Sequence, residues 1–194
     1  MLQCFGLSEK VFTAVRLVFC YNKAMTIQEL QAGDLLFVKD ASDLSQAIQE
    51  ATGKYSHVAI YFDHMIYHAT RDKGVIKEDL AAFLASHSQA IAVYRYPQIN
   101  VEKVFRAAEN LLGKPYNDSF YPDNDAYYCS QYIASILPIF PPIPMQFGDG
   151  NQEISPFWQA YYDKLGLAVP FNQPGTNPSQ LAQSKLLHYV GELI

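Results

Sequence analysis

Two short apolar runs separated by a two-residue loop constrain the fold of this chain more than any other feature. Residues 57–62 and 65–70 are rich in β-branched and aromatic side chains, and Asp63-His64 lies between them. This pattern predicts a β-hairpin. Because side chains alternate between the two faces of a strand, the register places His57 and His68 on the same face. The two imidazoles are then diagonal neighbours, with backbone positions about 7–8 Å apart.

The rest of the chain predicts an α+β fold, in which antiparallel strands are followed by helices. Further strands are expected at residues 35–38, 74–77 and 90–96, and helices at residues 43–52, 80–84, 101–112 and 157–165. Two segments rich in proline, residues 138–144 and 170–178, are expected to be irregular loops.

Cys129 opens an apolar, helix-like segment that ends at Pro138. Asp125 is the expected N-cap, which places Cys129 in about the fourth helical position. The dipole at a helix start favours a thiolate, and an unpaired backbone N–H there can stabilise an oxyanion. Cys129 is therefore a candidate nucleophile.

A nucleophilic cysteine needs a base and a third polar group that fixes the ring and tautomer of that base. The predicted hairpin supplies both, with His57 as the base and His68 as the group that orients it. Two other interpretations remain open from the residues alone. In the first, Cys129 is a small core residue, because it shares a helical face with Ile133 and Ile136. In the second, Cys129 and the two histidines are the ligands of a zinc site.

The other histidines and cysteines carry no comparable pattern. His64 is expected in the hairpin loop, and His87 and His188 are expected on the surface. Cys4 and Cys20 have no base nearby in the sequence, so they are expected to be inert. The spacings typical of zinc sites are absent from the sequence, so no metal is assigned.

Composition narrows the class of protein. The chain has 194 residues, 49% hydrophobic and 17% charged, which is typical of one globular domain. Its net charge of -5 and scattered Lys and Arg argue against a nucleic-acid partner. No apolar run reaches the length of a membrane span. Three cysteines are too few for a disulfide framework, which slightly favours the cytoplasm over an exported location.

The first residues are expected to form an extension to the main domain. Residues 11–20 are apolar but interrupted by Arg16, and they lack a clear cleavage site. We therefore expect an N-terminal helical extension over residues 1–30 and a catalytic domain over residues 31–194.

Several motifs follow in a characteristic order. They are Gly-Asp-Leu-Leu-Phe at 33–37, Tyr-Ser-His-Val-Ala-Ile-Tyr at 55–61, a polar residue one strand later, Gly-Lys-Pro-Tyr-Asn at 113–117 and Tyr-Tyr-Cys-Ser at 127–130. Together they resemble the permuted papain-like amidases of the YiiX/YebB type, relatives of the NlpC/P60 cysteine peptidases. In this group the histidine precedes the cysteine, as it does here. The tail segments 174–179 and 190–193 are also similar to bacterial members.

The resemblance implies a nucleophile at Cys129, a base at His57 and a third polar residue at His68. Two positions depart from the pattern. Gln131 stands where many members of the resembled group have Glu. The third polar residue, here His68, is Glu in some permuted members, whereas histidine is typical of the lecithin retinol acyltransferase branch.

The sequence thus predicts a cysteine hydrolase that cleaves an amide through a thioester and needs no cofactor. Tyr55, Tyr128 and Ser130 are the candidate oxyanion or substrate-binding residues. The expected substrate is a small peptide or cell-wall fragment. A lipid amide or ester, cleaved or transferred as in the acyltransferase branch, is the first alternative, and an inactive binding domain of papain-like shape is the second. The oligomeric state is not predicted.

Overall fold

A computed structural model describes residues 23–122 and 125–193 of the chain. The predicted helix at residues 11–20, together with Cys4 and Cys20, lies outside the described residues. In chain order the elements are β1 (Ala24–Met25), η1 (Ile27–Glu29), β2 (Leu35–Val38), α1 (Asp43–Thr52), β3 (His57–Phe62), β4 (Met65–Thr70), β5 (Gly74–Asp79), α2 (Leu80–Ser86), β6 (Ile91–Arg95), α3 (Val101–Asn110), α4 (Cys129–Ile136), β7 (Ile143–Pro144), α5 (Pro156–Leu165), β8 (Pro174–Gly175), α6 (Pro178–Ala182) and β9 (His188–Leu193).

One sheet carries the fold, and the α+β prediction is confirmed. Its strand order is β1-β9-β6-β2-β3-β4-β5, and every pair is antiparallel except β1 with β9. Part of the predicted N-terminal extension therefore belongs to the sheet, because Ala24 and Met25 pair with the last strand. Among the described residues, no helix combines the length and apolar character of a membrane span.

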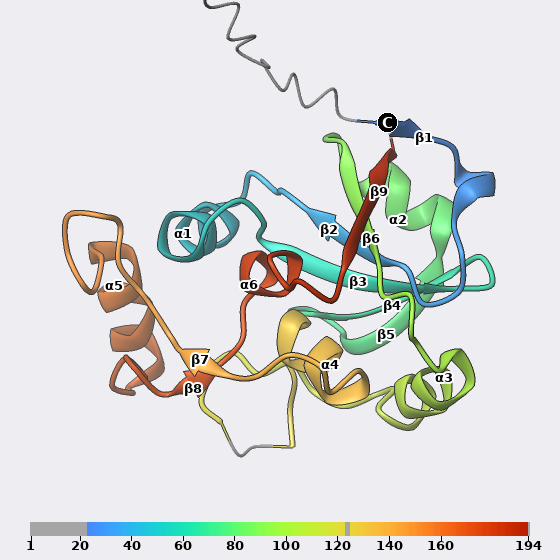
Figure 1. Ribbon diagram of the computed structural model, residues 1–194. Coiled ribbons are helices and arrows are strands. Elements are labelled where there is room, and N and C mark those ends of the chain that lie inside the picture. The colour runs from blue at the N-terminus through green and yellow to red at the C-terminus, as the bar shows by residue number, and fades with distance from the viewer. Residues whose placement is uncertain (1–22, 123–124, 194) are drawn as a thin grey trace, which may run out of the picture.

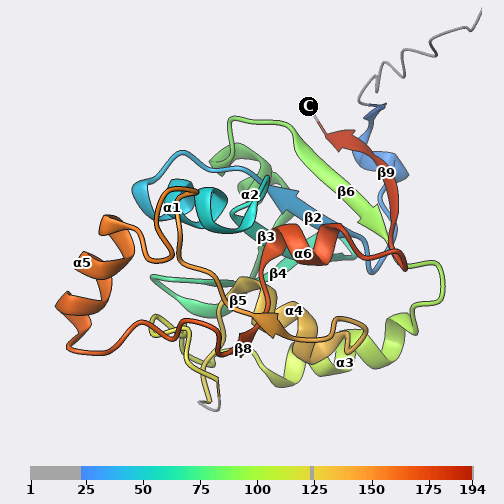
Figure 2. The ribbon, with the colours of Figure 1, turned by 60° about the vertical axis from the view of Figure 1, so that its left-hand side comes forward.

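Helices cover both faces of the sheet (Figure 1). Helix α4 contacts β3 and β4 on one face, and α2 contacts β4 and β5 on the other. The faces bury separate cores because their side chains alternate: Val58 and Ile60 lie in the core with α4, whereas Ala59 and Ile66 pack with Phe83 of α2. A third, smaller core joins α1, α5 and the segments around β7 and β8 beside the start of α4 (Figure 2).

The predicted hairpin is present with its predicted register. Phe62 pairs with Met65 and Ile60 with Tyr67. Asp63 and His64 both have positive φ, 44° and 64°, which is the backbone of the tight turns that match the twist of two antiparallel strands. The position of His64 in this loop is confirmed.

The segment between α3 and α4 is held against the sheet by backbone hydrogen bonds. The N–H of Val75 donates to the Lys114 carbonyl, and the N–H of Gly113 donates to the Val75 carbonyl. Gly74 has a φ of 72°, and a Cβ there would lie 2.3 Å from the Lys114 oxygen. Only glycine fits at this approach, so the β4–β5 turn fixes the segment that leads to Cys129.

The two proline-rich segments are more ordered than predicted, because residues 138–144 contain β7 and residues 170–178 contain β8. The loop predicted at 170–178 contains β8, which pairs with β7, and α6 begins at its last residue. Proline is compatible with both places: it occurs in a two-residue edge ladder and in the first turn of α6, where no N–H is needed.

A buried ion pair locks the sheet at the motif of residues 33–37. Asp34 is fully buried, and its carboxylate accepts two hydrogen bonds from Arg95 of β6, at 2.6 and 2.8 Å. It also accepts the N–H of Gln31 at 2.8 Å. The motif therefore has a structural role, because this carboxylate joins the start of β2 to the end of β6.

Replacing Arg95 with Ala is expected to lower the free energy of unfolding by about 3 kcal/mol, because it leaves a buried carboxylate without its cation. Urea denaturation measures this loss. The matched control is Arg106→Ala, which removes an exposed pair with Glu102 on α3 and is expected to cost less than about 0.5 kcal/mol. Equal losses in the two variants would contradict the structural role of the Asp34 pair.

Candidate active site

Helix α4 begins at Cys129, so the predicted cap at Asp125 is wrong. Asp125 instead forms an exposed ion pair with Lys114. Tyr128 occupies the N-cap position with an extended backbone. The side-chain oxygen Oε1 of Gln131 accepts hydrogen bonds from the Tyr128 N–H at 3.3 Å and from Asn117 Nδ2 at 3.1 Å. Gln131 therefore closes the start of the helix through its side-chain amide oxygen.

The Cys129 thiol is buried at the first position of this helix. Its exposed fraction is 5%, and Sγ lies 4.0 Å from the Ser56 carbonyl oxygen. Burial raises the pKa of the thiol to about 11, while backbone N–H groups of Val58, Ser130 and Cys129 itself act in the opposite direction. At this helix start desolvation outweighs the N–H groups, so the helix dipole by itself does not yield a thiolate.

The two histidines of the hairpin are joined directly. His57 Nε2 lies 2.9 Å from His68 Nδ1, at hydrogen-bonding distance. The prediction that they share a face is confirmed. Burial lowers the pKa of His57 to about 3, with a further contribution from the charge of His68, and burial also lowers the pKa of His68 to about 4. Both imidazoles are therefore neutral at pH 7.

The thiol and the imidazoles lie on opposite faces of the sheet. His68 lies on the face covered by α2, with its ring 5.5 Å from that of Phe83, whereas α4 packs on the other face. The β3–β4 pairing ends at Ile60 and Tyr67, so the strands separate beyond this point. A cleft of about 620 Å³ lies there and is lined by Cys129, His57 and His68 together.

Two carboxylates beside the histidines were not predicted. His68 Nε2 lies 3.0 Å from Glu78 Oε1, although this contact lacks the alignment of a hydrogen bond. His68 pairs with Ile76 on β5, so Glu78, two residues further, lies on the same face. That parity is the sequence signal that would have found Glu78. The other carboxylate, Asp40, lies 2.9 Å from His87 Nδ1.

Two histidines were expected on the surface, and the structure places only one of them, His188, there. The His87 side chain is only 12% exposed, packs on Phe83 and borders the cleft, so its predicted surface position is wrong. The residue follows α2 directly, and α2 covers the sheet next to the cleft. His188 is exposed, as predicted.

The three predicted binding residues lie in different places. Tyr128 and Ser130 flank Cys129 and line an apolar pocket beside it. Tyr55 lies apart, outside the lining of both the pocket and the cleft, with its hydroxyl 3.5 Å from that of Tyr94. Tyr55 is therefore left out of the proposed site.

The zinc interpretation finds no support in the geometry. Within residues 23–122 and 125–193, no three His, Cys, Asp or Glu side chains are grouped as metal ligands. His57 and His68 also direct ring nitrogens at each other, which uses atoms that a shared metal would need.

The sequence pattern of the permuted papain-like amidase enzymes of the YaeF/YiiX type, family C92, matches residues 29–190 of this chain. The chain belongs to this family. A permuted papain-like amidase of this type is a cysteine hydrolase that acts on amides. The inactive binding domain is thereby disfavoured.

A solved structure with the same fold is YiiX from Escherichia coli O157:H7, described as a metalloprotein. It is 24% identical to this permuted papain-like amidase, the match covers 84% of this chain and 97% of YiiX, and the TM-score is 0.67. No curated protein matches the chain.

Acidification is expected to destabilise this C92-family chain through its buried histidines. An unfolded histidine binds a proton below its usual pKa of about 6.5, whereas folded His68 resists protonation down to a pKa of about 4. The contribution of His68 to the free energy of unfolding is therefore fully present above pH 6.5, and it is lost as the pH falls toward 4. His68→Gln should reduce the loss between pH 7 and pH 5 by about 1–2 kcal/mol, measured by urea denaturation. The exposed His188→Gln is the control, and an equal effect in both would contradict the burial argument.

Proposed function

We propose that this chain cleaves a peptide-type amide, as found in peptides and cell-wall fragments, through a thioester on Cys129. His57 is the base and His68 the positioning residue. The observation that carries the proposal is the His57–His68 hydrogen bond at 2.9 Å in the cleft that the Cys129 thiol also borders. The family supports amide hydrolysis, and the assignment of these three roles is our own.

The hydrogen bond restricts which ring nitrogen does the chemistry. His57 Nε2 is engaged with His68, so Nδ1 is the nitrogen that remains for the thiol proton. Neutral His57 must then carry its proton on Nε2 and donate it to His68 Nδ1. His68 in turn carries its proton on Nε2, the atom that lies 3.0 Å from Glu78. Glu78 therefore favours the tautomer that the base needs.

The reaction starts from a neutral pair, because burial disfavours both the thiolate and the imidazolium. The thiol proton moves to His57 Nδ1 as Sγ attacks the carbonyl carbon, which creates an oxyanion. The backbone N–H of Cys129, one of the unpaired donors at the helix start, stabilises that oxygen. His57 then gives its proton to the leaving nitrogen, and the C–N bond breaks. Water deprotonated by His57 hydrolyses the thioester and restores the thiol.

Cys129→Ala is expected to abolish amide hydrolysis, and His57→Gln to lower kcat by about 10²–10⁴-fold, which is the usual contribution of a general base. The assay compares muropeptides with lipid amides and esters by mass spectrometry of the products. An active-site-directed electrophile should label Cys129 in the wild type, and His57→Gln should slow this labelling.

His188→Gln is the matched control and should retain full activity, because His188 is exposed and borders neither the cleft nor the pocket. Hydrolysis that persists in Cys129→Ala would refute the nucleophile. Unchanged labelling in His57→Gln would refute the base.

Glu78→Gln tests the tautomer argument. The substitution is expected to lower kcat by about tenfold, which corresponds to about 1.4 kcal/mol of transition-state stabilisation. Removing the negative charge also disfavours imidazolium, so the acidic limb of the kcat/KM profile should move to lower pH. Glu109→Gln is the control, since Glu109 bonds Tyr67 and Lys77 away from the cleft. An unshifted acidic limb in Glu78→Gln would contradict the positioning role.

A further inference from the structure

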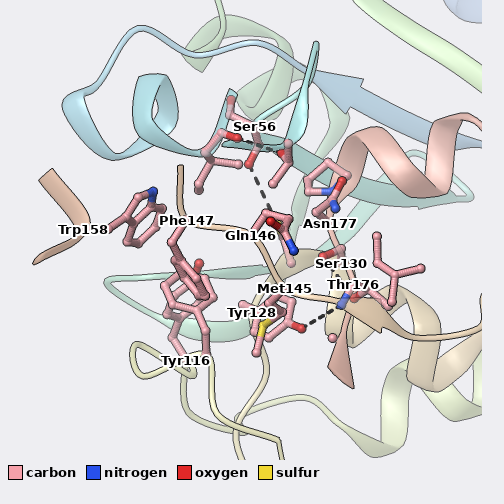
Figure 3. A pocket seen from close by; sticks show the side chains of 17 residues that line it. Ser56, Tyr116, Tyr128, Ser130, Met145, Gln146, Phe147, Trp158, Thr176 and Asn177 are labelled. Atoms are coloured by element: carbon pink, nitrogen blue, oxygen red, sulfur yellow. Dashed lines mark hydrogen bonds between the residues drawn. The ribbon is translucent and has the colours of Figure 1, made fainter. Parts of the chain in front are cut away.

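An apolar pocket lies on the side of Cys129 away from the histidines. Figure 3 shows the rings of Trp158, Phe147 and Tyr116 along part of its wall and Met145 close to Tyr128. The Phe147 and Trp158 rings pack edge to face with centroids 5.1 Å apart, in the small core beside the start of α4. Packed aromatic rings of this kind make a preformed wall, because little side-chain freedom remains to be lost.

Three polar residues of the wall bond to one another, whereas the buried indole Nε1 of Trp158 has no hydrogen-bond partner among the described residues. The Tyr128 hydroxyl accepts the N–H of Thr176 at 3.1 Å, and the Thr176 hydroxyl donates to Ser130 Oγ at 3.2 Å. The pocket therefore presents mainly carbon to its contents. A charged group there would lose its water without gaining an opposite charge, because no Lys, Arg, Asp or Glu side chain in the described part of the chain lines the pocket.

The cleft on the other side of Cys129 has the opposite character. Besides His57 and His68 it is lined by Arg71, Lys73 and Asp43, charged groups of both signs. Pocket and cleft meet at four residues that line both: Ile48, Ser56, Tyr116 and Cys129. The thiol thus stands where an apolar site joins a polar one.

We infer that the substrate is an amide of a small apolar acyl group, held in the pocket, with a polar amine, held in the cleft. This inference rests on the proposed function. In the tetrahedral intermediate the carbon carries Sγ, the oxyanion, the leaving nitrogen and the acyl substituent. His57 protonates the leaving nitrogen and borders only the cleft, so the amine departs there. The acyl substituent then lies on the remaining side, in the pocket.

The dimensions of the pocket limit the acyl group. Its volume is about 50 Å³. One water needs about 10–15 Å³ on this scale, so the pocket holds roughly three to five heavy atoms. A butyryl group or a branched aliphatic side chain fits, whereas a long fatty acyl chain exceeds the available space. Met145 contributes to this limit, since its side chain lines the pocket and packs directly against the backbone of Gly175.

Acylation of Cys129 by p-nitrophenyl esters tests which acyl groups the pocket accepts. The test does not need His57 to act as an acid, because p-nitrophenolate leaves without protonation. Acetyl, butyryl, dodecanoyl and succinyl esters are compared by the p-nitrophenol burst and by the mass of the Cys129 thioester. The expected rate rises about fourfold for each methylene from acetyl to butyryl. The rate falls for the dodecanoyl ester, whose chain is longer than the pocket. The succinyl ester reacts more slowly than the acetyl ester, because its acyl group carries a charge into an apolar pocket.

Met145→Ala should raise the dodecanoyl-to-butyryl rate ratio by about tenfold, because the loss of the side chain beyond Cβ enlarges the pocket. A ratio measured within one preparation is independent of the folded fraction. Met65→Ala is the matched control, since Met65 lies in the β3–β4 turn region and borders neither site. Lys73→Ala should leave the dodecanoyl-to-butyryl rate ratio unchanged, because Lys73 lines the cleft and not the pocket. It should weaken cleavage of butyryl-glycine, whose amine part carries a carboxylate, relative to butyryl-glycinamide, whose amine part does not.

The outcomes separate the two proposals. Cys129-dependent acylation that is indifferent to chain length, or that favours succinyl, overturns the acyl assignment and leaves the cysteine hydrolase intact. Efficient dodecanoyl transfer by the wild type overturns the size limit. Equal rates in wild type and Cys129→Ala for every ester overturn both proposals.

Discussion

The candidate site depends on the point where strands β3 and β4 stop pairing. Up to Ile60 and Tyr67 the two strands form a regular ladder, and beyond it they separate. Sγ lies at this end of β3, beside the Ser56 carbonyl and the Val58 N–H, on the face that α4 covers. His57 and His68 remain close enough to bond across the gap between the strands. A continuous ladder would satisfy these backbone groups and separate the thiol from the imidazoles by the thickness of the sheet.

Burial then decides the chemistry of this gap. A low-dielectric site raises the pKa of the thiol and lowers those of both histidines, so the resting groups are neutral. Backbone N–H groups and the Glu78 carboxylate act against desolvation at the moment charge develops. The adjoining pocket is apolar because side chains such as Phe147 and Trp158 line it. The proposed proton transfer and the proposed acyl selectivity therefore both depend on low exposure to water around Cys129.

Local patterns predicted those parts of the structure that neighbouring residues determine. The hairpin register followed from alternation and a two-residue loop, and it correctly joined His57 with His68. The helix cap at Asp125 failed because the preceding segment is held by Lys114 and by the sheet, which moves the helix start to Cys129. His87 was misplaced because its burial comes from Phe83 and from Asp40, 47 residues away in the sequence.

The sequence by itself determined the α+β class, the shared face of the two histidines and the family resemblance, because alternation and motif order are local properties. Tertiary structure alone decided that the thiol is protonated, that Asp40 lies beside His87 and that Tyr55 lies apart. It also placed an apolar pocket and a charged cleft on the two sides of Cys129. These features depend on desolvation and on contacts between α1, α4, α5 and the sheet, which no local pattern records.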